Sequence, residues 1–108
     1  MIIIIKGGIR LFDVKKNNNV IGMVHLLPLP SSPNFKNNMN EIYERALEEG
    51  EILEKTGYDG LIVENFGDIP YKVKPNNIDI ISSMAAIVSL LKNRLNIPIG
   101  VNVQFNDI

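Results

Sequence analysis

The sequence predicts an α/β fold in which strands and helices alternate as β-α-β-α-β in one parallel sheet. Short apolar segments alternate with longer amphipathic ones, in the order 20–27, 38–56, 59–64, 77–96 and 98–103. Val24, Val63 and Val101 lie 39 and 38 residues apart, so the unit repeats almost evenly. This order is typical of right-handed crossovers, and it indicates a (β/α) barrel or a doubly wound sheet.

The three apolar segments are predicted to be buried strands. Val20–Leu27 (VIGMVHLL) is a nearly continuous apolar run that ends at Pro28. Asp59–Glu64 (DGLIVE) and Pro98–Val103 (PIGVNV) are shorter segments of the same kind. Apolar runs without polar alternation are typical of strands that are covered on both faces, as in parallel sheets.

Segment 38–56 is predicted to be the first helix. Asn38 or Asn40 can cap its N-terminus, and Gly57 follows its last residue, as is common at helix ends. One apolar stripe follows the helical period and is made of Ile42, Ala46, Leu47, Gly50 and Leu53.

Segment 77–96 is predicted to be the second helix, with Asn77 as the candidate cap and Asp79 in its first turn. Lys92 and Arg94 suit the negative C-terminal end of the helix dipole. The apolar spacing predicts a buried face made of Ile81, Met84, Val88, Leu91 and Leu95, widened by Ile80 and Ile87.

Composition excludes several classes of function. The chain is 45% apolar and 21% charged, values typical of a folded globular domain. A net charge of −1 gives no electrostatic reason to expect nucleic-acid binding. The absence of cysteine excludes thiolate nucleophiles and cysteine-ligated zinc, and a single histidine excludes a multi-histidine metal site. The chain is Asn-rich, with 14 asparagines that lie largely in short runs typical of loops.

The sequence also favours a soluble protein. Met1–Ile5 is apolar, but a helix that spans a bilayer needs about 20 residues, and no signal-peptide pattern surrounds this run. We therefore expect a cytoplasmic location. Residues 1–36 hold five basic side chains against Asp13, a net charge of +4. Peripheral contact with anionic lipid is an alternative to plain solvent exposure of this segment.

Five segments resemble the BtpA family, which comprises photosystem I biogenesis and SgcQ-type proteins. They are, in order, LFDVKK (11–16), VIGMVHLLPLPSSP (20–33), DGLIVENFGDIP (59–70), MAAI (84–87) and PIGVNVQFND (98–107). Ser31 stands where a glycine is usual in the family's proline-rich turn, and the Met1–Arg10 extension has no family counterpart.

The resemblance implies a TIM (β/α)8 barrel, of which this chain would hold the first three strands. A complete barrel takes eight strands and about 250 residues, so we expect the barrel to be truncated. We expect residues 1–19 to be an N-terminal extension and lead-in, and residues 20–108 a partial BtpA-like domain. The remaining barrel segment, or self-association into a homo-oligomer, would cover the open sheet.

Polar side chains follow each predicted strand at its carboxyl end, where (β/α) barrels build their active sites. We expect His25 and Glu64 to be catalytic. An imidazole can transfer protons near neutral pH, and a carboxylate at the barrel mouth needs a partner or a ligand. The candidate substrate-binding residues are Asn65, Asp68, Asn102, Asn106 and Asp107.

Each candidate also has a structural alternative. His25 can be packed beneath the proline-rich turn, and Glu64 can pair with a lysine from strands beyond this chain. Asp68 and Asp107 could join Glu64 around a divalent cation, but aspartate is also common in loop capping, and no metal site is assigned. The asparagines could orient a sugar or a phosphate, or they could be loop residues.

Three functions stay open from the sequence. The resemblance implies a role in the biogenesis or stability of photosystem I, exerted by contact. The second is a TIM-barrel enzyme for a small phosphorylated or nucleoside-type substrate, with His25 and Glu64 as acid and base. The third is a truncated product without activity. No cofactor follows from the residues, and autonomous catalysis by three strands is not expected.

Overall fold

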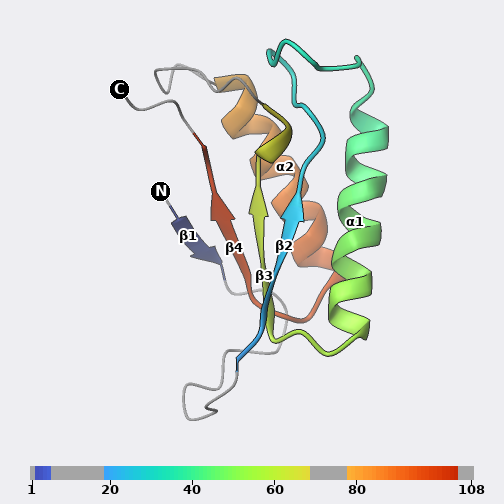
Figure 1. The fold of residues 1–108 in the computed structure, drawn as a ribbon, viewed down its shortest axis with the longest axis vertical. Coiled ribbons are helices and arrows are strands. Elements are labelled where there is room, and N and C mark those ends of the chain that lie inside the picture. The colour runs from blue at the N-terminus through green and yellow to red at the C-terminus, as the bar shows by residue number, and fades with distance from the viewer. Residues whose placement is uncertain (1, 6–18, 69–77, 105–108) are drawn as a thin grey trace.

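The computed structural model of the chain describes residues 2–5, 19–68 and 78–104 (Figure 1). Its elements, in chain order, are β1 (Ile2–Ile5), β2 (Ile21–His25), α1 (Met39–Lys55), β3 (Gly60–Glu64), the short 3-10 helix η1 (Phe66–Asp68), α2 (Ile78–Arg94) and β4 (Ile99–Asn102). The three predicted strands and the two predicted helices are confirmed as β2, β3, β4, α1 and α2.

A single sheet with the strand order β1-β4-β3-β2 forms one layer of the molecule. β2, β3 and β4 are parallel and lie side by side in chain order. Their register aligns Val24 with Val63, and Val63 with Val101. The nearly even repeat of the sequence therefore becomes one row of valines across the sheet.

The strand β1 is a feature that the sequence analysis did not assign. It pairs antiparallel with β4, from Ile2 opposite Asn102 to Ile5 opposite Ile99. The signal is the run of four isoleucines, because β-branched residues favour an extended backbone. β1 occupies the edge of the sheet that lies farthest from β2.

Helix α1 is capped at both ends. Asn38 Oδ1 accepts a hydrogen bond from the backbone N–H of Glu41 at 3.1 Å, so Asn38 rather than Asn40 is the N-cap. At the C-terminus the N–H groups of Gly57 and Tyr58 donate to carbonyls of the last turn, the paired bonds of a Schellman motif. Gly57 has a φ of +97°, which glycine adopts without steric cost.

Helix α2 buries a stripe that differs from the predicted one at one residue. Ile81 was expected to be buried, but it is 48% exposed, whereas Ile80 and Ile87 are 3% and 0% exposed. The helix packs through Ile80, Ile87 and Leu91, and Ile81 is turned about 100° from Ile80 around the axis. Burial is confirmed for Met84 and for the remaining members of the predicted face.

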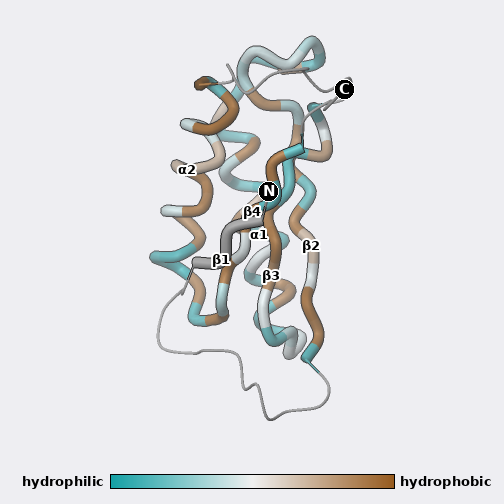
Figure 2. Tube along the Cα trace, turned by 90° about the vertical axis from the view of Figure 1, so that its left-hand side faces the viewer, coloured by the Kyte–Doolittle hydropathy of each residue, from teal (hydrophilic) through white to brown (hydrophobic). Residues whose placement is uncertain are grey.

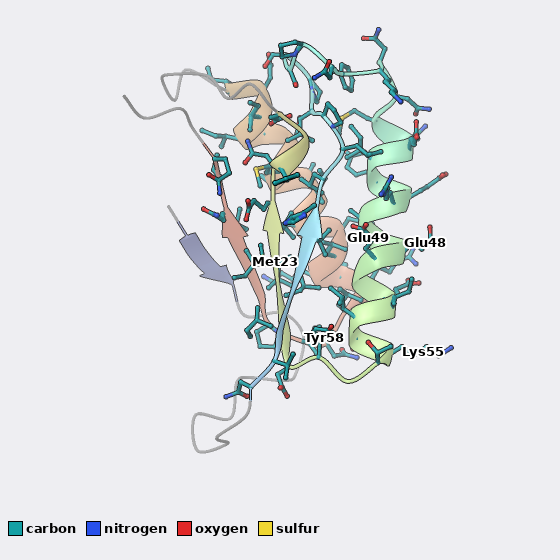
Figure 3. All side chains as sticks on the ribbon, viewed as in Figure 1. Met23, Glu48, Glu49, Lys55 and Tyr58 are labelled. Atoms are coloured by element: carbon teal, nitrogen blue, oxygen red, sulfur yellow. The ribbon has the colours of Figure 1, made fainter. Side chains whose placement is uncertain are left out.

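Both described helices cover the same face of the sheet, which we call the helix-covered face (Figures 1 and 2). On β2 the side chains alternate between buried and exposed. Val24 and Val63 are 0% exposed beneath the helices, while Ile21 and Met23 are 39% and 41% exposed on the opposite side. We call that side the open face, and Met23 marks it in Figure 3. The prediction that β2 is covered on both faces is therefore wrong for the part that the structure describes.

Candidate functional site

Three polar side chains form one row across the carboxyl ends of the parallel strands. The register places His25 of β2 beside Glu64 of β3, and Glu64 beside Asn102 of β4. Successive side chains of a strand point to opposite faces, and Val24 and Val63 point into the helix-covered core. The row therefore lies on the open face, and the structure brings together three residues that the sequence predicts at separate strand ends.

The Glu64 carboxylate is held by two side-chain amides. Asn102 Nδ2 donates to Oε2 at 3.2 Å, and Gln104 Nε2 donates to Oε1 at 3.0 Å. All three residues are partly buried, so these bonds fix the carboxylate at the carboxyl end of β3. Gln104 was missed by the sequence analysis. Its signal is its position two residues after Asn102, on the same side of an extended segment.

The His25 ring stacks on Phe66. The ring centroids are 4.6 Å apart and the planes meet at 16°. His25 is exposed, and Phe66 is 47% exposed. The imidazole is thus not packed in the interior beneath the proline-rich turn, which was its structural alternative. The end of β2 and the helix η1 together place an aromatic surface beside the Glu64 carboxylate.

Asn65 directly follows β3 and Asp68 ends η1. Both side chains are buried, at 0% and 2% exposed. Asp68 accepts hydrogen bonds from the Leu29 backbone N–H at 2.8 Å and from Asn65 Nδ2 at 3.0 Å. Asn65 Oδ1 accepts the Gln104 backbone N–H at 2.6 Å. The two side chains therefore connect the segments that follow β2, β3 and β4. Their role in binding a substrate stays a prediction.

Gly67 allows η1 to lie directly against the segment after β2. Its N–H donates to the Leu26 carbonyl at 3.1 Å. A Cβ at this position would lie 2.6 Å from that oxygen and 2.7 Å from the Pro28 nitrogen, too close for either backbone atom. Any side chain here would displace η1, and with it Phe66 and Asp68. Gly67 was also missed by the sequence analysis, although it lies within the family-like segment DGLIVENFGDIP (59–70).

The segment after β2 contains a type II β-turn. The Ser32 N–H donates to the Leu29 carbonyl at 2.9 Å, which places Pro30 and Ser31 at the two central positions. Proline favours the first position, and the second requires a positive φ. Ser31 has a φ of 71°. This geometry gives a physical reason for the glycine that the family resemblance leads us to expect at position 31.

Asn106 and Asp107 lie outside the described residues, so their role in binding stays a prediction. Within residues 2–5, 19–68 and 78–104, no group of three or more His, Cys, Asp or Glu side chains could hold a metal ion. The divalent-cation alternative needs Asp107 together with Glu64 and Asp68. In the same described ranges, no helix is long and apolar enough to cross a membrane.

Comparison with known proteins gives matches over most of the chain. Residues 16–108 match the BtpA family. An uncharacterized protein of Methanocaldococcus jannaschii is 41% identical over 92 residues, which cover 85% of this chain and 35% of that protein. The Photosystem I biogenesis protein BtpA of Synechocystis is 44% identical over 91 residues, covering 84% and 32% respectively.

A further relative is an uncharacterized mitochondrial protein of Caenorhabditis elegans, 41% identical over 76 residues that cover 69% of this chain and 27% of that protein. The chain spans about a third of the length of the curated relatives it matches first, at 35%, 34% and 32%. No solved structure matches it. The family match begins after β1 and includes every other described element. The chain belongs to the BtpA family.

Proposed function

We propose that the described sheet is part of the wall of a (β/α) barrel and that its open face turns toward the barrel interior. β2, β3 and β4 are neighbours in chain order, and both helices cover one face, as a barrel wall requires. A doubly wound sheet carries helices on both faces. The apolar run of β2 exposes Met23 at 41%, although such runs are typical of strands covered on both sides.

The function that the geometry supports best is the binding of a small, neutral, hydroxyl-bearing ring compound, such as a nucleoside, at the row of His25, Glu64 and Asn102. One observation carries this proposal: Glu64 is fixed by two amides beside the stacked rings of His25 and Phe66. Carboxylates accept hydrogen bonds from hydroxyl groups, and an aromatic surface favours a planar ring. The side chains of this site, His25, Glu64, Phe66, Asn102 and Gln104, include no lysine or arginine, so a phosphate would need cations from elsewhere in the protein.

Within this site His25 and Glu64 are the proposed acid and base. An imidazole donates and accepts protons near neutral pH, and a carboxylate fixed at both oxygens needs little reorganisation when a substrate arrives. Asn102 and Gln104 also position the Glu64 carboxylate, because each donates a hydrogen bond to it. Turnover is proposed for a protein of the relatives' length, since three strands supply only part of a barrel's loops.

The single histidine of the chain makes the test direct, since the His25 ring gives the one set of imidazole signals in an NMR spectrum. We would titrate the isotope-labelled chain with uridine and, separately, with inorganic phosphate. Uridine is expected to shift the His25 ring signals and the amides of Glu64 and Asn102, and phosphate is expected to leave them unchanged.

Glu64→Gln should weaken the response to uridine. Glu48→Gln is the matched control, because Glu48 is exposed on the outer side of α1 and should leave the response intact (Figure 3). Uridine-induced shifts spread along α1, or a folded chain that shows no shift at saturating uridine, would contradict the proposed site.

The second candidate function is a contact role in the biogenesis of photosystem I. It is favoured by the 44% identity to the Synechocystis protein whose name states that role. A pull-down with purified photosystem I tests it. Binding that survives His25→Ala and Glu64→Gln supports a contact role through another surface, and no binding removes this candidate.

The remaining alternative is a truncated product without activity of its own. Unfolding in denaturant tests it, because a small folded domain loses its structure in one cooperative transition. A single transition of the monomer counts against this alternative. A gradual loss of structure, without a transition, supports it.

A further inference from the structure

The outer edge of β4 is covered by a strand that the family match does not include. β4 pairs in parallel with β3 on one side and antiparallel with β1 on the other. β1 lies opposite every residue of Ile99–Asn102. The backbone groups that β4 directs away from β3 therefore face β1 along the whole strand.

The position of β1 conflicts with the continuation of the parallel order. The family match begins at residue 16, whereas β1 is Ile2–Ile5. A barrel that continued beyond β4 would place its next parallel strand on the same edge, since β3 already occupies the other. The chain spans about a third of its relatives, at 35%, 34% and 32%. β1 and such a strand cannot pair with β4 at the same time.

We propose that the β4 edge is a strand-acceptor surface and that β1 is a removable cap on it. The partner that fits this surface is an extended peptide segment rich in β-branched residues, which β1 supplies within the chain. Open strand edges add strands from other chains through backbone hydrogen bonds. β1 blocks such addition, because it already pairs antiparallel with β4 along the whole edge. This inference does not depend on the proposed ligand site.

The test removes the cap in two ways. One variant lacks Ile2–Ile5, and the other carries Ile3→Pro with Ile4→Pro. Proline has no N–H to donate, and of two consecutive strand residues one directs its N–H toward the neighbouring strand. The matched control carries Ile3→Val with Ile4→Val, which keeps β-branched residues.

The probe is a fluorescent synthetic peptide with the sequence of Met1–Arg10 (MIIIIKGGIR), and its binding is followed by fluorescence anisotropy. In the wild type and the valine control, the tethered β1 competes with the peptide for the β4 edge at an effective concentration in the millimolar range. Both cap-deficient variants should therefore bind the peptide at least about tenfold more tightly than these two chains. Without peptide, the cap-deficient variants should self-associate in light scattering, and the other two chains should stay monomeric. Equal peptide affinity in all four folded chains would overturn the proposal.

If the cap-deficient variants do not fold, hydrogen exchange on the wild-type chain tests whether β1 covers the β4 edge. The amides of Ile99–Asn102 that do not bond to β3 are expected to be protected from exchange. Carbonyl groups of β1 accept their hydrogen bonds, or β1 shields them from solvent. Exchange of these amides at the rate of exposed residues would show that no cap is present, and this result also overturns the proposal.

Discussion

The two faces of the sheet differ in what their residues do. On the helix-covered face Val24 and Val63 are 0% exposed and pack with the apolar stripes of both helices. On the open face Met23 is 41% exposed, and the Glu64 carboxylate is fixed by hydrogen bonds instead of core packing. The fold is stabilised from one side. On the other side it exposes apolar side chains of β2 and, at the carboxyl ends of the strands, the polar row. Substitutions on the two faces should therefore have separable effects.

The largest expected effect comes from adjacent residues of β2 that point to opposite faces. Val24→Asp places a carboxylate in the helix-covered core, and we expect a loss of at least about 4 kcal/mol in the free energy of unfolding. Met23→Asp is the matched change on the open face, and its cost should stay within about 1 kcal/mol. Urea unfolding of both variants measures the difference. Equal losses would mean that the open face is also packed.

The next effect concerns the contact between η1 and the segment after β2. Gly67→Ala should lower the free energy of unfolding by about 3 kcal/mol, because a Cβ forces backbone displacement. It should also shift the His25 ring signals in NMR, since η1 carries Phe66. Gly57→Ala meets no atoms within 4 Å and should cost only about 1 kcal/mol for its positive φ. A larger loss for Gly57→Ala would contradict the close approach at Gly67.

Removing the buried carboxylate of Asp68 should have a somewhat smaller effect on the free energy of unfolding. Asp68→Ala leaves the Leu29 N–H and the Asn65 amide without this acceptor, which we expect to cost about 2 kcal/mol in urea unfolding. Asp79→Asn on the exposed start of α2 is the control, with an expected change within about 0.5 kcal/mol. If both variants are equally stable, the connection between the strand-end segments is not formed in solution.

The smallest effect is a gain in stability at the β-turn. Ser31→Gly should raise the free energy of unfolding by about 0.5 kcal/mol, since relief of the left-handed backbone outweighs the greater freedom of glycine in the unfolded chain. Ser31→Ala keeps a Cβ and should give no gain. Thermal unfolding of the three chains provides the measurement, and a loss on Ser31→Gly would argue against the type II turn.

Much of the fold could be predicted because its signals are local. Apolar runs, helical spacing and the Asn38 cap each specify one element without knowledge of its neighbours. The row of His25, Glu64 and Asn102 was also predictable in outline, since parallel strands place their carboxyl ends at one edge of a sheet. A repeat of nearly constant length is enough to bring such residues together.

The remaining features depend on contacts between distant segments. Gly67 is required only because a backbone oxygen of the segment after β2 lies against it. The Asn65–Gln104 bond joins residues 39 apart, and no local pattern marks it. The exposure of Ile81 depends on where α2 meets the sheet. β1 forms because β4 offers an edge, which the isoleucine run alone does not reveal.

The central claim is that the open face of the sheet exposes His25 at a ligand site. The most direct test is the reactivity of this single histidine toward diethyl pyrocarbonate. Mass spectrometry would follow its modification in the folded chain, with and without uridine, and in the urea-unfolded chain. The account predicts modification of the folded chain at a rate close to that of the unfolded chain, because the ring is exposed on the open face, and slower modification when uridine is bound. A His25 that is unreactive in the folded chain, or whose rate uridine does not change, would contradict it.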